Sequence, residues 1–350
     1  MKVNRLEIKK NNMIGHDVTS GNVQKMIDRC SVCMVCGSTQ FELRYAVTDT
    51  NQDVPGEWDI LACRACGTGV LSPFPDNAQI SGFYRNVFYT EDGRRFRNWM
   101  ESIRAALGRL RGVGLNRLKP EKGHLLDFGS GAGHFSVAQR KAGWVVDAVD
   151  PYSAASSDAG SCRVTVDGIE LLYPDGHFDA ISLWYVIEHL RNPSQVIKEM
   201  ARVLKPDGIL ILAQQDFSSI QARVFGDKWL YLDPPRHIWQ FTCESLLTLA
   251  QKHDFRVVKK SWASMEMGPF SILQSTLNMI VGNRNDLFRF LKNRKLSNPL
   301  GDKNSSRIRL WPTVVSLVML PLLGPLAFLA YFALLCVRSG DVVTLYLRKA

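Results

Sequence analysis

The stretch His124-Leu125-Leu126-Asp127-Phe128-Gly129-Ser130-Gly131-Ala132-Gly133-His134-Phe135 decides the fold. Its apolar start, Leu125 to Phe128, predicts a buried strand of a parallel sheet. Three glycines at alternate positions follow, and a helical pattern begins at Phe135. Glycines let the backbone turn tightly and let a ligand approach the main chain, and the first turn of a helix offers unpaired N–H groups. The stretch therefore predicts a strand–turn–helix unit that binds a ligand at its turn.

Two details of the sequence narrow the class of ligand that this turn is expected to bind. The spacing is G-x-G-x-G, and His134 stands where a dinucleotide fingerprint has its third glycine. Asp127 lies two residues before the first glycine, and Asp150 ends the next apolar strand, Trp144 to Val149. An acid about twenty residues after the glycines can accept both hydroxyls of a ribose.

With these features the sequence resembles the class I S-adenosylmethionine-dependent methyltransferases, and most of all their type 11/23 branch. The resemblance covers roughly residues 122–263. It continues in Phe178-Asp179-Ala180-Ile181, in Val186-Ile187-Glu188-His189-Leu190 and in Arg202-Val203-Leu204-Lys205-Pro206-Asp207-Gly208, where Asp207 replaces the usual Gly. A doubly wound fold without this cofactor is the alternative.

The resemblance implies how S-adenosylmethionine is bound. The main chain of Gly129, Ser130, Gly131 and Gly133 approaches its methionine end, and Asp150 holds its ribose. Asp127 orders the loop and the ammonium end of the cofactor. The adenine slot is lined by Tyr152, Asp167, Gly168 and Ile169.

Alternating strand and helix patterns predict an α/β fold with a doubly wound, seven-stranded sheet. We expect strands near 124–128, 144–149, 162–167, 178–183, 208–213 and 255–263, and helices near 134–142, 152–158, 193–204 and 243–253. Residues 341–348 follow Gly340 and read as the strand that the resembled fold inserts antiparallel between its fifth and sixth strands. The core then comprises 122–265 and 341–350, with a helical insertion at 266–340.

Two C-x-x-C-G knuckles predict a four-cysteine zinc ribbon in residues 30–75, followed by linker helices in 76–121. Zinc favours four thiolates in a tetrahedron, and each knuckle supplies two from one tight turn. Cys30 is an alternative to the first ligand, and a chance gathering of thiols is the alternative to a metal. The expected ligands, of a structural zinc ion, are Cys33, Cys36, Cys63 and Cys66.

Eight cysteines without an apolar leader at residues 1–12 favour metal or free thiols over disulfides, and so a reducing, cytosolic location. The formal net charge of +10 is uneven, because residues 94–119 carry +7 and residues 284–309 carry +6. The first segment predicts an amphipathic helix with arginines on its outer face. Such basic surfaces fit anionic lipid, phosphate or nucleic acid, or they are simply solvated.

Leu310 to Val337 are twenty-eight residues without a charge, long enough for a membrane-spanning helix. Three prolines and Gly324 interrupt the run, and a single crossing would separate the last strand from its sheet. We therefore expect a helical hairpin that dips into the inner face of a membrane, with the basic run on the headgroups. A buried cover over the core, a dimer face and a single span are the alternatives.

Candidate catalytic residues follow the carboxyl ends of the fourth and fifth strands, where ligands bind in such sheets. Glu188 and His189 follow one strand, and His237 lies in the loop after the other. His237 is the expected base or orienter of the substrate, and Arg236 the expected contact to a substrate anion. Each of these residues has a structural alternative, in which it only ties down neighbouring backbone.

The favoured function is methyl transfer to a small-molecule, sugar-linked or lipid-linked acceptor, in glycan or quinone biosynthesis. A nucleic-acid methyltransferase that uses the ribbon and the basic helix is a second hypothesis, less favoured because the ribbon lacks a dense basic cluster. A non-catalytic interaction protein is the third, and the intact Asp127, glycines and Asp150 count against it.

Overall fold

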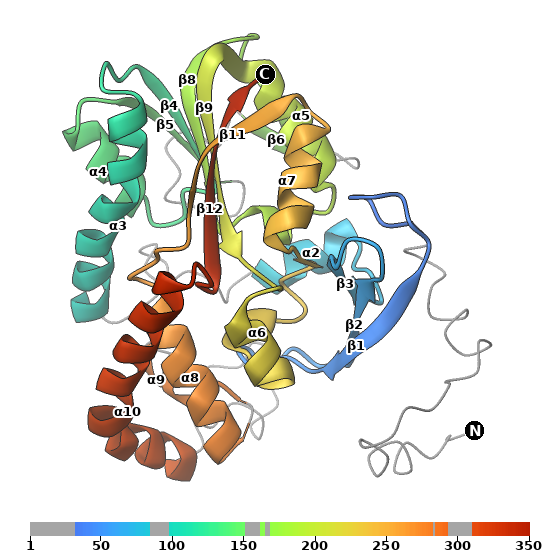
Figure 1. The fold of residues 1–350 in the computed structure, drawn as a ribbon, viewed down its shortest axis with the longest axis vertical. Coiled ribbons are helices and arrows are strands. Elements are labelled where there is room, and N and C mark those ends of the chain that lie inside the picture. Colours follow the sequence, from blue (N-terminus) through green and yellow to red (C-terminus); the bar gives the residue numbers. More distant parts are fainter. Residues whose placement is uncertain (1–31, 85–97, 151–161, 165–168, 283, 293–309) are drawn as a thin grey trace.

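A computed structural model describes residues 32–84, 98–150, 162–164, 169–282, 284–292 and 310–350. Figure 1 shows a central sheet seen nearly edge-on, a smaller sheet to its right and a helical group below. The predicted helix at 152–158 lies outside the described residues. Apart from the strand at 162–167, the other predicted core elements are present, with ends shifted by a few residues.

The central sheet has six strands in the order β11-β12-β9-β8-β4-β5. Strands β4, β5, β8 and β9 run parallel, and β12 inserts antiparallel between β9 and β11. The predicted position of the last strand is therefore confirmed. The bounds are β4 His124–Phe128, β5 Val145–Val149, β8 Phe178–Trp184, β9 Leu204–Gln215, β11 Phe255–Ser261 and β12 Val342–Lys349.

The prediction of a seventh strand at 162–167 is not confirmed in the described part of the chain. Residues Cys162–Val164 form β6, which pairs antiparallel with β7, Ile169–Leu171, as a separate two-stranded sheet. In the described residues β6 pairs with β7 and not with β5, so the central sheet ends at β5.

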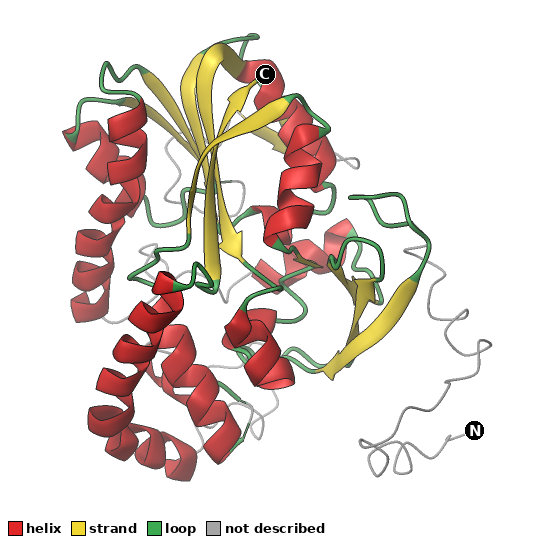
Figure 2. Cartoon of the chain, in the orientation of Figure 1, coloured by secondary structure: helices red, strands yellow, loops and turns green. Residues whose placement is uncertain are grey.

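Helices cover both faces of the central sheet, with α3 and α4 on one side and α5 and α7 on the other (Figure 2). Neighbouring strand residues point to opposite faces: Leu125 packs in the cluster of α3 and α4, and Leu126 in that of α5 and α7. The bounds are α3 Asn98–Leu118, α4 His134–Lys141, α5 Pro193–Val203 and α7 Cys243–Gln251. Asn192 and Thr242 cap α5 and α7 through their side chains.

The cysteine-bearing segment builds a second sheet in the order β1-β2-β3-β10. Its first three strands are Phe41–Val47, Trp58–Cys63 and Gly69–Ser72, followed by helix α2, Asn77–Tyr84. The fourth, β10, is Trp239–Gln240 from the loop after β9. Cys33, Val35 and Leu61 share one apolar cluster with core residues, so this sheet is joined to the core and does not stand as a separate unit.

The insertion between β11 and β12 differs from its prediction. It contains α8 Gly268–Val281, α9 Asp286–Leu291 and α10 Leu310–Cys336, and it packs near α6, Ile220–Phe225. The apolar run is one continuous helix instead of a hairpin, because Pro321 and Pro325 bend it without ending it. Figure 1 shows this bend.

Candidate functional site

The glycine turn has the geometry expected for ligand approach. Gly129, Gly131 and Gly133 have φ angles of 76°, 56° and 74°, a region that side chains disfavour. A Cβ atom at Gly129 would lie 2.2 Å from Val186 Cγ2, whereas at Gly133 it would meet open space. Gly129 therefore serves close packing, and Gly133 lies where a ligand can reach the backbone before α4.

Asp150 lies beside this turn, as predicted from its spacing. Its Oδ2 accepts a hydrogen bond of 2.9 Å from the Gly131 N–H, and its side chain is 7% exposed. The buried hydroxyl of Ser130 has no hydrogen-bond partner in the described part of the chain. The Ser130 hydroxyl and the Asp150 carboxylate beside the glycine turn fit the polar amino, carboxyl and ribose groups of S-adenosylmethionine. The roles of Ser130 and Asp150 toward the cofactor stay predictions.

Asp127 faces inward. Its carboxylate accepts hydrogen bonds from Ser136 Oγ at 2.5 Å and Ser182 Oγ at 2.9 Å. It therefore joins β4 to α4 and β8, and burial raises its pKa despite these bonds. The sequence predicted a role in ordering the loop, which this arrangement fits, and its role toward the ammonium end of the cofactor stays a prediction.

The adenine slot is only partly described. Tyr152, Asp167 and Gly168 lie outside the described residues. Ile169 is buried at the start of β7.

The structure brings the three predicted catalytic residues together. Glu188 and His189 lie in η3, Ile187–His189, directly after β8. His237 lies in the loop before β10, and its ring stands edge-on to that of His189 with centroids 4.7 Å apart. One ligand atom from each of the three side chains lies within 4.8 Å of the others. Burial raises the pKa of Glu188 to about 8.

Arg236 does not fit its predicted role as a contact to a substrate anion. Its side chain is fully buried and forms ion pairs with Asp49 and Asp233 at 2.7 and 2.5 Å. The guanidinium pairing lowers the pKa of Asp233 against the opposing effect of burial. Because Asp49 lies between β1 and β2, Arg236 fastens the His237 loop to the second sheet.

Sequence reasoning missed a polar group at the end of β8. Tyr185 has a φ of 60°, rare for an aromatic residue, and its hydroxyl lies 3.1 Å from Ser264 Oγ. Arg111 of α3 stacks over the Tyr185 ring and pairs with Glu266. No sequence spacing connects these residues, because they come from three segments that only the fold brings together.

The basic segments are partly neutralised. Arg284 and Arg289 both pair with Asp53 of the second sheet. Residues 293–309 of the same segment lie outside the described residues. The described part of this segment, residues 284–292, is therefore less cationic in the fold than its sequence indicates.

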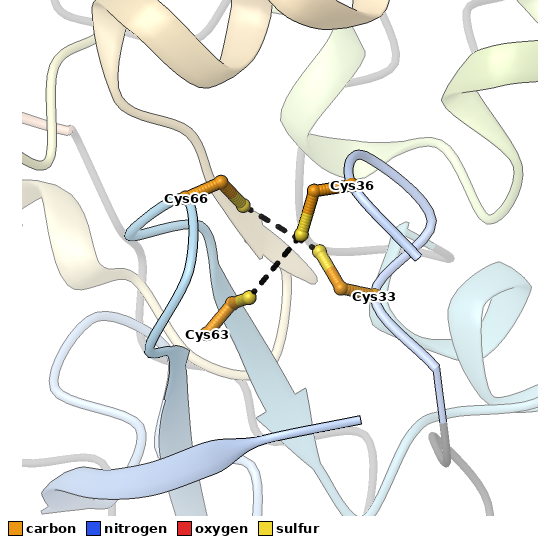
Figure 3. A group of neighbouring side chains, drawn as sticks. All are labelled: Cys33, Cys36, Cys63 and Cys66. Carbon is orange, nitrogen blue, oxygen red and sulfur yellow. Dashed lines mark hydrogen bonds between the residues drawn. The ribbon is translucent and has the colours of Figure 1, made fainter. Parts of the chain in front are cut away.

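The four predicted cysteines converge, as Figure 3 shows. Cys33 Sγ lies 3.6 Å from Cys66 Sγ, and Cys36 Sγ lies 3.5 Å from Cys63 Sγ. Four thiolates around zinc at about 2.3 Å would be about 3.8 Å apart, so the cluster has the size of a zinc site. Gly37 and Gly67 donate backbone hydrogen bonds to the carbonyls of Cys33 and Cys63, which closes each knuckle.

Comparison with known proteins agrees with this geometry. Residues 92–260 match the type 23 family described as "Methyltransferase domain". The chain is 35% identical over 112 residues to the demethylmenaquinone methyltransferase of Corynebacterium glutamicum strain R, covering 31% of this chain and 47% of the relative. It is 26% identical over 150 residues to the ubiquinone biosynthesis O-methyltransferase of Caulobacter sp. strain K31, covering 39% of this chain and 59% of that relative. The chain thus spans about half the length of the curated relatives it matches.

Among solved structures, the 1,6-didemethyltoxoflavin-N1-methyltransferase of Burkholderia thailandensis, with bound S-adenosylhomocysteine, aligns at 17% identity. The alignment covers 59% of this chain and 89% of that one, with a TM-score of 0.40, too low to bear on function. The family match and the relatives carry the assignment. Residues 92–260 of this chain match a methyltransferase domain, and the relatives named above are methyltransferases, which supports the S-adenosylmethionine-dependent enzyme class that the sequence resembles.

Proposed function

We propose that this protein transfers a methyl group from S-adenosylmethionine to a lipid-linked acceptor at a membrane surface. The observation that carries the proposal is the exposed apolar helix α10. Only 11% of the most apolar window of Trp311–Cys336 is buried, and Trp311 and Val318 are 75% and 73% exposed. A soluble core helix would be mostly buried, and an apolar patch of this size marks a contact with lipid or protein.

The position of α10 connects this surface to the site. Val342, six residues after α10 ends, pairs with Gln215 at the carboxyl end of β9. The glycine turn and Glu188 follow the carboxyl ends of β4 and β8. The apolar helix therefore approaches the sheet edge where the cofactor and the acceptor meet.

A short chain of contacts leads from α10 to that edge. The hydroxyl of Tyr331 in α10 accepts a hydrogen bond of 2.5 Å from the Ser264 N–H, and Ser264 Oγ lies 3.1 Å from the Tyr185 hydroxyl. Tyr185 follows β8 directly. An acceptor held along α10 would have its polar end beside Tyr185.

Two relatives named for quinone biosynthesis favour an isoprenoid quinone or its precursor as the acceptor class. S-adenosylmethionine supplies an already activated methyl group when bound. What remains for the chain is to align the acceptor and to remove a proton from it. Glu188, His189 and His237 are the groups that would do so.

We also propose a structural zinc ion on Cys33, Cys36, Cys63 and Cys66. Their convergence and the size of the cluster support it. The ion would hold the second sheet, and through β10 the His237 loop, in place.

The test uses methyl-labelled S-adenosylmethionine, purified protein and an extract of the cells that produce it. The extract is separated into lipid, nucleotide-sugar, nucleic-acid and protein pools. Label in the lipid pool, lost with Asp150→Ala and reduced with His237→Ala, supports the proposal. Label in the nucleic-acid or nucleotide-sugar pool would refute a lipid-linked acceptor.

A further inference from the structure

Glu188, His189 and His237 place one carboxyl group and two imidazoles side by side. Removing a proton from the acceptor would require only one of these groups. The Glu188 side chain is 1% exposed, and its oxygens make no hydrogen bond of regular geometry in the described residues, although the Gln215 side chain lies near enough to oppose the rise in its pKa. A buried carboxyl group of this kind is held as the neutral acid unless a cation compensates its charge. Arg236, the nearby guanidinium of the same loop, is already paired with Asp49 and Asp233.

The backbone fixes how the two imidazoles are protonated. His189 Nδ1 lies 3.0 Å from the Arg236 carbonyl oxygen, and His237 Nδ1 lies 2.7 Å from that of Tyr231. A carbonyl oxygen only accepts, so each Nδ1 carries a proton and donates it. In the neutral rings the lone pairs are then on Nε2. This is the arrangement by which proteins orient histidine ligands of metals.

We propose that Glu188, His189 and His237 bind one divalent first-row transition-metal ion through a carboxylate oxygen and two imidazole Nε2 atoms. Imidazole and carboxylate together suit zinc, iron(II), manganese or cobalt. A carboxylate oxygen of Glu188 and one ring nitrogen of each histidine lie within 4.8 Å of one another. Bonds of about 2.0–2.2 Å require ligand atoms roughly 3–3.5 Å apart, so small side-chain rotations would close the site.

The ion would leave at least one coordination position open. That position would lie at the sheet edge where Glu188 follows β8. Resting on the proposed function, we infer that it binds a hydroxyl oxygen of the acceptor. The metal would lower the pKa of that hydroxyl, so that the acceptor oxygen is presented as an anion.

The test counts cobalt(II) in protein that has been stripped of metal and reloaded. Cobalt distinguishes the two candidate sites, because only the four-cysteine cluster gives intense thiolate charge-transfer bands. We expect two ions per chain in the wild type, one in His189→Ala, and one without thiolate bands in Cys66→Ser. His253→Ala is the matched control, since its Nε2 contacts Ser194 Oγ and His253 belongs to neither of the two groups of candidate metal ligands found in the described residues. It should keep both ions.

A single ion per chain in the folded wild type, with thiolate bands only, would overturn the proposal. Circular dichroism checks that each variant is folded, and Glu188→Gln, which keeps the shape of the side chain, serves as a second variant. This substitution should weaken the affinity for the second ion at least about tenfold. Because the count requires no acceptor, its outcome is independent of whether methyl transfer to lipid is observed.

Discussion

At the scale of single residues, Arg236 shows how much the loop around His237 depends on one buried side chain. Its guanidinium joins Asp49, from the second sheet, to Asp233, from its own loop. Removing one partner of a buried ion pair costs more than the pair contributes, because the remaining charges stay buried and unpaired.

Arg236→Met should therefore lower the free energy of unfolding by about 3–5 kcal/mol, measured by urea denaturation. The matched control is Arg163→Met, which breaks an exposed pair with Glu170. That change should cost at most about 1 kcal/mol. Equal effects of the two substitutions would contradict the structural role of Arg236.

Asp341 gives a prediction of pH dependence. It is fully buried before β12, and burial raises its pKa from 3.8 to about 7. The folded state therefore binds its proton more tightly than the unfolded state does. The stability linked to this group is complete below about pH 4 and is lost as the pH rises through about 7.

Between these values the wild type should lose up to about 1.4 kcal/mol of stability per pH unit through Asp341. Asp341→Asn should flatten that part of the profile, as followed by denaturation at a series of pH values. If the plot of unfolding free energy against pH keeps the same slope in the variant, the pKa of Asp341 is not raised in the folded protein.

At the scale of elements, the sequence predicted those helices, strands and turns that depend on the residues next to them in the chain. The strand at 124–128 and the glycine turn depend on neighbouring residues and appear as expected. The apolar run at 310–337 was interpreted wrongly as a hairpin. Proline disfavours a helix interior but does not forbid it, and the 27-residue helix has enough other hydrogen bonds to continue past Pro321 and Pro325.

The exposed face of α10 should bind membranes. Leu322→Asp with Phe328→Asp should reduce flotation of the protein with anionic phospholipid vesicles severalfold, because each charge opposes burial in lipid. Leu43→Asp, at an exposed apolar position of β1, is the control and should float like the wild type. Loss of folding in the double variant, seen by circular dichroism, would instead indicate that α10 is part of the core.

At the scale of the whole molecule, the sequence could not show how the cysteine segment joins the core. It predicted a ribbon at 30–75 but not that β10 would complete its sheet, because two residues carry no strand pattern. For the same reason Asp49 was not seen as the partner of Arg236, 187 residues away. Long-range pairing of this kind is determined by packing and leaves no local signal.

This connection predicts that the cysteine cluster controls the His237 loop. Cys66→Ser should remove the proposed zinc and increase amide hydrogen exchange at residues 233–240 as well as in β1–β3. Cys243→Ser, a buried cysteine outside the cluster, should leave exchange in both regions unchanged. Faster exchange confined to residues 32–72 would contradict the coupling.

The most direct measurement is calorimetric titration of the folded protein with S-adenosylmethionine. The account predicts one binding event in the wild type. It further predicts at least about tenfold weaker binding in Gly133→Ala, whose Cβ would enter the open space where a ligand reaches the backbone, than in Gly176→Ala, a glycine outside the turn with a similar positive φ and open space. Absence of binding to the folded wild type, or equal affinity in the two variants, would contradict the assignment of the glycine turn as the cofactor site.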